Sequence, residues 1–274
     1  MQAAEAGNAA AQTHLGWCYD EGVGVGVDHD KAFYWHSRSA EAGDATGQFN
    51  LAMCYELGTG TEIDLTKAVY WYTKSAEQDD QDAICQLGIF YEEGIGVDAD
   101  PVKAVNLYRK AGSMGNSIAV NRLGYCCEEG IGTEKNPALA VDFYKIAAKA
   151  GLCSAQFNLA LCYENGTGIR KNMRLAVKYY KLAAEQGDAK SQCNLGVCYA
   201  DGTGVKQDYA QAVKWYKLAA EQDDDIALYN LGEAYRFGEG VKKCCKKAVE
   251  YYTKAAELGN RKARKVLKKM ESAK

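Results

Sequence analysis

The sequence predicts an all-α solenoid of seven 36-residue helix-turn-helix repeats, followed by a C-terminal capping helix. Three observations predict it: a leucine recurs every 36 residues, two glycines follow the leucine of each of the seven repeats at fixed offsets, and a helix-capping residue follows the glycines in six of them. A fixed period of this length is typical of stacked helix pairs, in which each pair buries its apolar face against its neighbours. The recurring leucines are Leu15, Leu51, Leu87, Leu123, Leu159, Leu195, Leu231 and Leu267.

The first helix of each repeat surrounds the leucine, which is numbered as position 0 of the repeat. A small residue at −4, the leucine at 0 and a tyrosine at +4 share one helical face, because about four residues make one turn. A glycine or alanine at +1 lets a partner helix approach closely. The tyrosine at +4, such as Tyr55 or Tyr163, is expected to fill the gap between repeats.

Two glycines end the first helix and form the turn to the second. The glycine at +7 suits a left-handed helix C-cap, and the glycine at +9 suits a tight turn with positive φ. A phosphate-binding loop is not expected, because no strand precedes this G-x-G pattern. The second helix should begin after an Asp or Asn at +13, which is a good N-cap, and Pro101 and Pro137 follow such a residue. Cys244 replaces the cap in repeat seven, so this helix is expected to start differently.

The repeat unit reads A-x3-L-G-x2-Y-x2-G-x-G-V-x2-D-x2-K-A-x3-Y-x2-A-A, and residues 195–205 are a good instance of its first half. This unit closely resembles the SEL-one-like repeat (SLR), a relative of the tetratricopeptide repeat, over nearly the whole chain. The resemblance implies a right-handed α/α superhelix whose first helices line the concave side, and a role as a scaffold or adaptor in protein complexes. Seven repeats are expected over 11–262, after the tail of a truncated preceding repeat at 1–10 and before a basic capping helix at 263–274.

The resemblance also predicts where a partner would bind. On the tetratricopeptide template, positions −1, +2 and +5 of the first helix face the groove. Here position +2 is mostly apolar, position +5 is acidic in repeats one to five, and position −1 carries several asparagines. The hypothesis is a groove that binds a basic, partly apolar or amphipathic segment of a protein partner. The predicted groove residues are Asn50, Met53, Glu56, Ile89, Glu92, Arg122, Tyr125, Glu128, Asn158, Leu161, Glu164, Asn194 and Asn230.

Each of these three columns has a structural alternative. The residues at +2 can pack between repeats, and the asparagines at −1 can bond the adjacent helix. The carboxylates at +5 oppose the helix macrodipole in the last turn, so they either pair with lysines or loop N–H groups, or face a ligand. Ala200 and Arg236 interrupt the acidic column in repeats six and seven.

Charge is distributed unevenly along the chain. Residues 242–274 hold 12 Lys/Arg and 3 Asp/Glu, whereas the rest holds 21 Lys/Arg and 33 Asp/Glu. The basic end is interpreted as the solvated face of the capping helix, with contact to an acidic partner, nucleic acid or an anionic membrane as the alternative. No nucleic-acid binding is expected, because no aromatic residue interleaves the charges of residues 261–269. No membrane insertion is expected either, because no apolar run reaches about 18 residues.

The eleven cysteines show no secretory-type spacing, and those at +3 are interpreted as small buried thiols. Free thiols favour a reducing compartment, so a cytoplasmic location is expected; a secreted or periplasmic location is the alternative if a leader has been removed. No metal site is expected, because the vicinal pair Cys126-Cys127 lacks C-x-x-C zinc spacing.

No residue set predicts an enzyme or a cofactor. Departures from the repeat at His36, Cys127 and Cys244 fall in different repeats, so no nucleophile–base cluster is expected. The Helicobacter cysteine-rich subgroup of this family has been labelled β-lactamase-like, but Ala148 and Ala155 stand where its disulfide cysteines would, and no S-x-x-K tetrad occurs. A further alternative is a regulatory interaction arm of a larger signalling protein. The sequence leaves the partner and the oligomeric state open.

Overall fold

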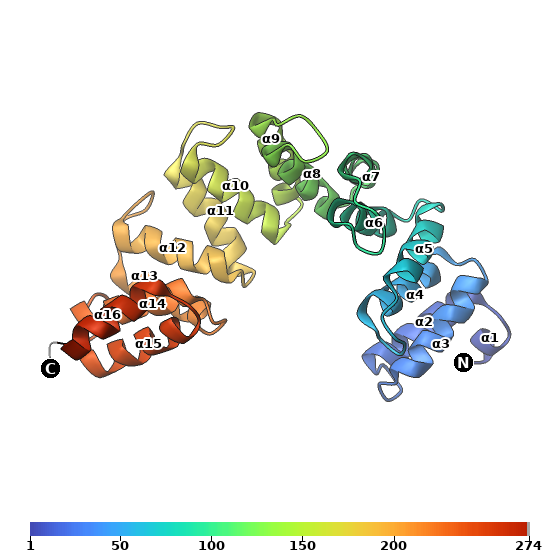
Figure 1. The fold of residues 1–274 in the computed structure, drawn as a ribbon, viewed down its shortest axis with the longest axis horizontal. Coiled ribbons are helices and arrows are strands. Elements are labelled where there is room, and N and C mark those ends of the chain that lie inside the picture. Colours follow the sequence, from blue (N-terminus) through green and yellow to red (C-terminus); the bar gives the residue numbers. More distant parts are fainter. Residues whose placement is uncertain (273–274) are drawn as a thin grey trace. The chain divides into compact units, whose positions relative to one another are not determined.

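The computed structural model describes residues 1–272, which form sixteen helices and no strand. The chain divides into two compact units, Met1–Phe143 and Tyr144–Lys274, and the division falls within α9 (Pro137–Lys149). Figure 1 shows successive helix pairs in each unit, which confirms the predicted all-α solenoid with a C-terminal helix. Residues 273 and 274, the end of the predicted capping helix, lie outside the described residues.

Unit 1 contains three complete helix pairs, and each helix packs on the helix before it and the helix after it. The pairs are α2 with α3, α4 with α5 and α6 with α7, and α8 packs against α7. The helices are α1 (Gln2–Glu5), α2 (Ala9–Glu21), α3 (His29–Glu41), α4 (Ala45–Leu57), α5 (Leu65–Ala76), α6 (Gln81–Glu93), α7 (Pro101–Ser113) and α8 (Ser117–Glu129).

Unit 2 repeats the same arrangement. Its pairs are α10 with α11, α12 with α13 and α14 with α15, and α16 packs on α15. The helices after α9 are α10 (Cys153–Asn165), α11 (Met173–Glu185), α12 (Ala189–Asp201), α13 (Tyr209–Ala220), α14 (Asp225–Phe237), α15 (Cys245–Glu257) and α16 (Arg261–Ser272). In the described part of the chain, no helix is both long and apolar enough to cross a membrane.

Caps fix the helix ends at the predicted positions. Asp64 accepts a 3.0 Å hydrogen bond from the backbone N–H of Lys67 at the start of α5, and Gly58 ends α4 at φ 72°. The expectation that Cys244 shifts the start of its helix was wrong. Helix α15 begins directly after Cys244, although this residue makes no side-chain cap. Packing fixes the start instead, because Ala248 is completely buried and its N–H still bonds the Cys244 carbonyl.

Tyrosines of the second helix, at position +21, dominate the core. They are Tyr72, Tyr108, Tyr144, Tyr180 and Tyr252, all at most 1% exposed. The prediction for position +4 was only partly right: the ring of Tyr55 contacts Phe33 of the preceding repeat at 5.5 Å, but Tyr55 is half-buried. The glycine at +1 makes room for the larger core residue, because a Cβ on Gly88 would lie 2.4 Å from the ring of Tyr108.

A column of thiols at +3 lies beside this core. Cys54, Cys126 and Cys198 are buried free thiols, as predicted, whereas Cys18 is half-buried. Burial raises the pKa of Cys54 and Cys126 to about 12 and that of Cys198 to about 11. These thiols are therefore protonated at neutral pH and are poor nucleophiles or metal ligands.

Candidate partner-binding face

An accessible column of apolar side chains follows the first helices of unit 1. Trp17 on α2, Met53 on α4 and Tyr125 on α8 all occupy position +2, and they are 44%, 38% and 42% exposed. Ile89, the equivalent residue on α6, is half-buried. Most of this column is therefore available to a partner, although inter-repeat packing was the alternative expected for it.

The same column is less accessible in unit 2. Leu161 on α10 and Val197 on α12 are half-buried. Repeat seven carries Glu233 at this position, and its carboxylate accepts a hydrogen bond from the hydroxyl of Tyr252. The two units therefore present different surfaces at position +2, although they share one repeat pattern.

The carboxylates at +5 point into their own repeats. The hydroxyl of Tyr72 donates to Glu56, and that of Tyr108 donates to Glu92, both at 2.5 Å. Tyr180 donates to Glu164 in the same way. Neither lysines nor loop N–H groups, the partners considered from the sequence, provide these contacts. Glu128 occupies the equivalent position on α8 and is half-buried.

Residues at position −1 in three repeats lie against the tyrosine–carboxylate pair of the preceding repeat. The Gln86 amide donates to Glu56 at 3.0 Å, and the Arg122 guanidinium lies 3.7 Å from Glu92. The side chain of Asn194 acts to lower the pKa of the Tyr180 hydroxyl, but burial and Glu164 raise this pKa by more. These contacts agree with the alternative that position −1 bonds the adjacent helix.

The asparagines at −1 do not all behave alike. Asn50 lines a cavity in unit 1, Asn158 is half-buried, and the side chain of Asn230 has no hydrogen-bond partner among the described residues. Asn50 and Asn230 therefore lie in different environments.

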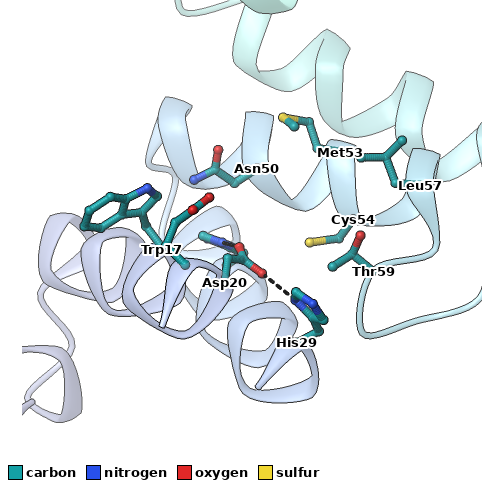
Figure 2. A pocket seen from close by; sticks show the side chains of 10 residues that line it. Trp17, Asp20, His29, Asn50, Met53, Cys54, Leu57 and Thr59 are labelled. Atoms are coloured by element: carbon teal, nitrogen blue, oxygen red, sulfur yellow. Dashed lines mark hydrogen bonds and ion pairs between the residues drawn. The ribbon is translucent and has the colours of Figure 1, made fainter. Parts of the chain in front are cut away.

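A cavity of about 280 Å³ opens beside the apolar column in repeats one and two. Figure 2 shows Trp17, Asn50 and Met53 around it, with Asp20 hydrogen-bonded to His29. Repeat one carries Asp20 and His36 where repeats two to five carry glutamate and tyrosine, and these shorter side chains fill less space. The cavity adds a recess to the accessible face of unit 1.

His36 is the most constrained group beside this cavity. Its imidazole is 1% exposed, and Nε2 lies 2.9 Å from the Asp20 carboxylate while Nδ1 has no partner. Asp20 only accepts hydrogen bonds when ionised, so Nε2 carries the proton. Burial lowers the pKa of His36, and the hydrogen bond to Asp20 opposes this effect only in part.

We expect His36 to make the fold less stable below about pH 6.5. Because the folded-state pKa is lowered, the unfolded chain binds this proton first as the pH falls, and stability is lost by up to about 1.4 kcal/mol per pH unit. Urea unfolding at pH 7.5 and 5.5 measures the loss. His36→Tyr should remove this part of the pH dependence, and His14→Gln, a change at an exposed histidine, should retain it. An equal loss in all three proteins would contradict the assignment.

Sequence reasoning missed three parts of this arrangement. The tyrosine at +21 was recognised as regular but was not paired with the carboxylate at +5, although both recur in the same repeats. Gln86 was not singled out because it breaks the asparagine pattern at −1. His36 was noted as a departure, but nothing in the sequence places it against Asp20, sixteen residues earlier.

Among the described residues, no group of three or more His, Cys, Asp or Glu side chains is arranged to hold a metal ion.

A family model described as the Sel1 repeat matches seven consecutive segments of the chain, namely residues 9–44, 45–80, 81–116, 117–152, 153–188, 189–224 and 225–260. The chain belongs to the Sel1-repeat family. This confirms the resemblance drawn from the repeat unit. Sel1-repeat proteins generally act as protein-interaction scaffolds, and their solenoids are typically non-catalytic.

Solved structures of other Sel1-repeat proteins are similar to this one. The protective antigen c5321 from uropathogenic Escherichia coli, which displays an SLR fold, is 34% identical with a TM-score of 0.79 over 95% of this chain. The chain spans only 56% of that protein. A Sel1 repeat protein from Oxalobacter formigenes is 31% identical with a TM-score of 0.80, over 97% of this chain and 77% of its own.

A more distant structure shares the fold alone. The immunity protein Pa5087 from Pseudomonas aeruginosa is 24% identical with a TM-score of 0.51, over 78% of this chain and 81% of its own. A search of curated proteins found no match to the sequence.

Proposed function

We propose that this Sel1-repeat protein is an interaction scaffold whose unit 1 binds an amphipathic segment of a protein partner. The exposed apolar column of Trp17, Met53 and Tyr125 carries the proposal. Apolar side chains spaced along successive helices suit a helix or extended segment that presents its own apolar side chains at regular intervals. The cavity between Trp17 and Met53 offers a place for one anchoring side chain, which is where binding energy concentrates in such interfaces.

The test removes the column and leaves the fold intact. A variant combining Trp17→Ala, Met53→Ala and Tyr125→Ala should lose the proteins that wild type captures from native extract, as quantified by mass spectrometry. Loss of these side chains should change stability little, because each is partly exposed already.

A matched control removes equally exposed apolar residues from the second helices. Tyr34, Tyr70 and Val102 are 50%, 54% and 60% exposed and lie on α3, α5 and α7. Their combined replacement by alanine should leave the captured proteins unchanged. If both variants capture the same proteins as wild type, the binding surface lies elsewhere and the proposal fails.

A further inference from the structure

Repeat six lacks the carboxylate that its neighbours place against the core tyrosine. Tyr180 in repeat five bonds Glu164, and Tyr252 in repeat seven bonds Glu233. In repeat six the tyrosine is retained as Tyr216, but position +5 is Ala200. The side chain that would accept the hydrogen bond is therefore replaced by a methyl group.

This substitution leaves polar groups without protein partners. Tyr216 is only 5% exposed, yet its hydroxyl makes no hydrogen bond to any described residue. The amide of Asn230, at position −1 of the next repeat, also has no hydrogen-bond partner among the described residues. Tyr216 is largely buried and Asn230 is half-buried, and the polar group of each remains available to a ligand that enters beside it.

Both groups line one cavity of about 370 Å³, which we call the Ala200 pocket. Apolar side chains, including Val197, Val213 and Ile226, form part of its wall. The pocket lies entirely within unit 2, between α12, α13 and α14, and receives Lys262 from α16. It can hold a long aliphatic chain with a polar end.

The charged residues that line the pocket determine whether an acidic or a basic guest fits it. Asp201, Glu233 and Glu239 contribute carboxylates, against the single ammonium of Lys262. Burial, and then nearby thiols and the carboxylates of Asp201 and Glu239, raise the pKa of Tyr216, so its hydroxyl stays neutral. Glu233 already faces the Arg236 guanidinium at 3.7 Å, so Asp201 and Glu239 are the carboxylates that repel an acidic guest and attract a basic one.

We propose that the Ala200 pocket binds the side chain of a lysine or arginine from a partner segment. The aliphatic part packs on the apolar wall, and the cationic end donates hydrogen bonds to the Tyr216 oxygen, the Asn230 carbonyl oxygen and a neighbouring carboxylate. This extends the proposed scaffold function to unit 2. It uses none of the unit 1 residues, so the two proposals can fail separately.

Peptide titration monitored by NMR tests the proposal, with the side-chain amide signal of Asn230 as reporter. The probe is acetyl-Ala-Leu-Lys-Leu-Ala-amide, compared with the same peptide carrying Gln or Glu in place of Lys. The lysine peptide should shift the signal saturably and bind at least about tenfold more tightly than the glutamine peptide. The glutamate peptide should not saturate. A shift equal for all three peptides, or none for the lysine peptide, would overturn the proposal.

Two variants separate the pocket from its surroundings. Ala200→Glu restores the carboxylate that repeats one to five carry at this position, so it should abolish the lysine-dependent shift while Tm stays equal or rises. Lys262→Gln removes the competing cation and should tighten binding several-fold, whereas Lys190→Gln on the exposed surface of α12 should change it less. Weaker binding by Lys262→Gln, together with binding of the glutamate peptide, would indicate an acidic guest and contradict the proposal.

Discussion

Replacing Gly60 with alanine should detach repeat one from repeat two. Gly60 has a φ of 66°, and a Cβ there would lie 2.1 Å from the backbone carbonyl oxygen of His29 in the preceding repeat. A backbone carbonyl cannot move aside as a flexible side chain can, so left-handed strain and steric overlap add together. We expect a loss of about 4 kcal/mol. Hydrogen exchange should show amides of residues 9–44 losing protection first, because each repeat is held mainly by its neighbours.

Gly24 provides the control for this substitution. It is the equivalent glycine of repeat one, with a φ of 74°, but a Cβ there would have nothing within 4 Å. Gly24→Ala should therefore lower the free energy of unfolding only by the cost of the left-handed conformation, about 1–2 kcal/mol. If the two variants lose equal stability, the close approach between repeats contributes nothing and the explanation is wrong.

Charge reversal at Glu92 should destabilise unit 1 strongly. The Glu92 side chain is 8% exposed, accepts the Tyr108 hydroxyl at 2.5 Å and faces Arg122. Glu92→Lys would leave that buried hydroxyl without its acceptor and place two cations together. Breaking a buried charged contact from one side costs about 3–5 kcal/mol. Denaturant unfolding measures the loss.

The neighbouring Glu93 separates this effect from surface charge. Its side chain is 48% exposed and lies 3.8 Å from the same Arg122. Glu93→Lys makes the same charge change and should cost at most about 1 kcal/mol. Equal losses would show that the buried contact is not responsible. A binding experiment based on Glu92→Lys would measure unfolding, so the exposed column at +2 is the better target.

The regular part of the fold could be predicted from sequence because it depends on local chemistry repeated seven times. Glycines with positive φ and Asp caps determine helix ends within a few residues, and Gly58 and Asp64 lie where their types require. Side-chain pairing could not be predicted in this way. Whether Glu56 faces solvent or Tyr72 depends on the packing angle of two helices, which the spacing along the chain does not specify.

The sequence predicted where the candidate binding face lies better than it predicted the contacts that the side chains make there. Met53 and Tyr125 are accessible as the groove hypothesis requires, because position +2 follows directly from the helical period. The Ala200 pocket was visible in the sequence only as a gap in the acidic column. The pocket depends on Tyr216 and Asn230 lining the same cavity, and this arrangement follows from the tertiary structure rather than from local sequence.

The thiols at +3 can report the opening of individual repeats when the protein is treated with an alkylating reagent. An alkylating reagent reacts with thiolate, and the Cys54, Cys126 and Cys198 thiols are both buried and held protonated. Each is modified only when the surrounding repeat opens, whereas the exposed Cys245 is modified without opening. The order in which these thiols become labelled therefore records the order in which the repeats come apart, without any added reporter group.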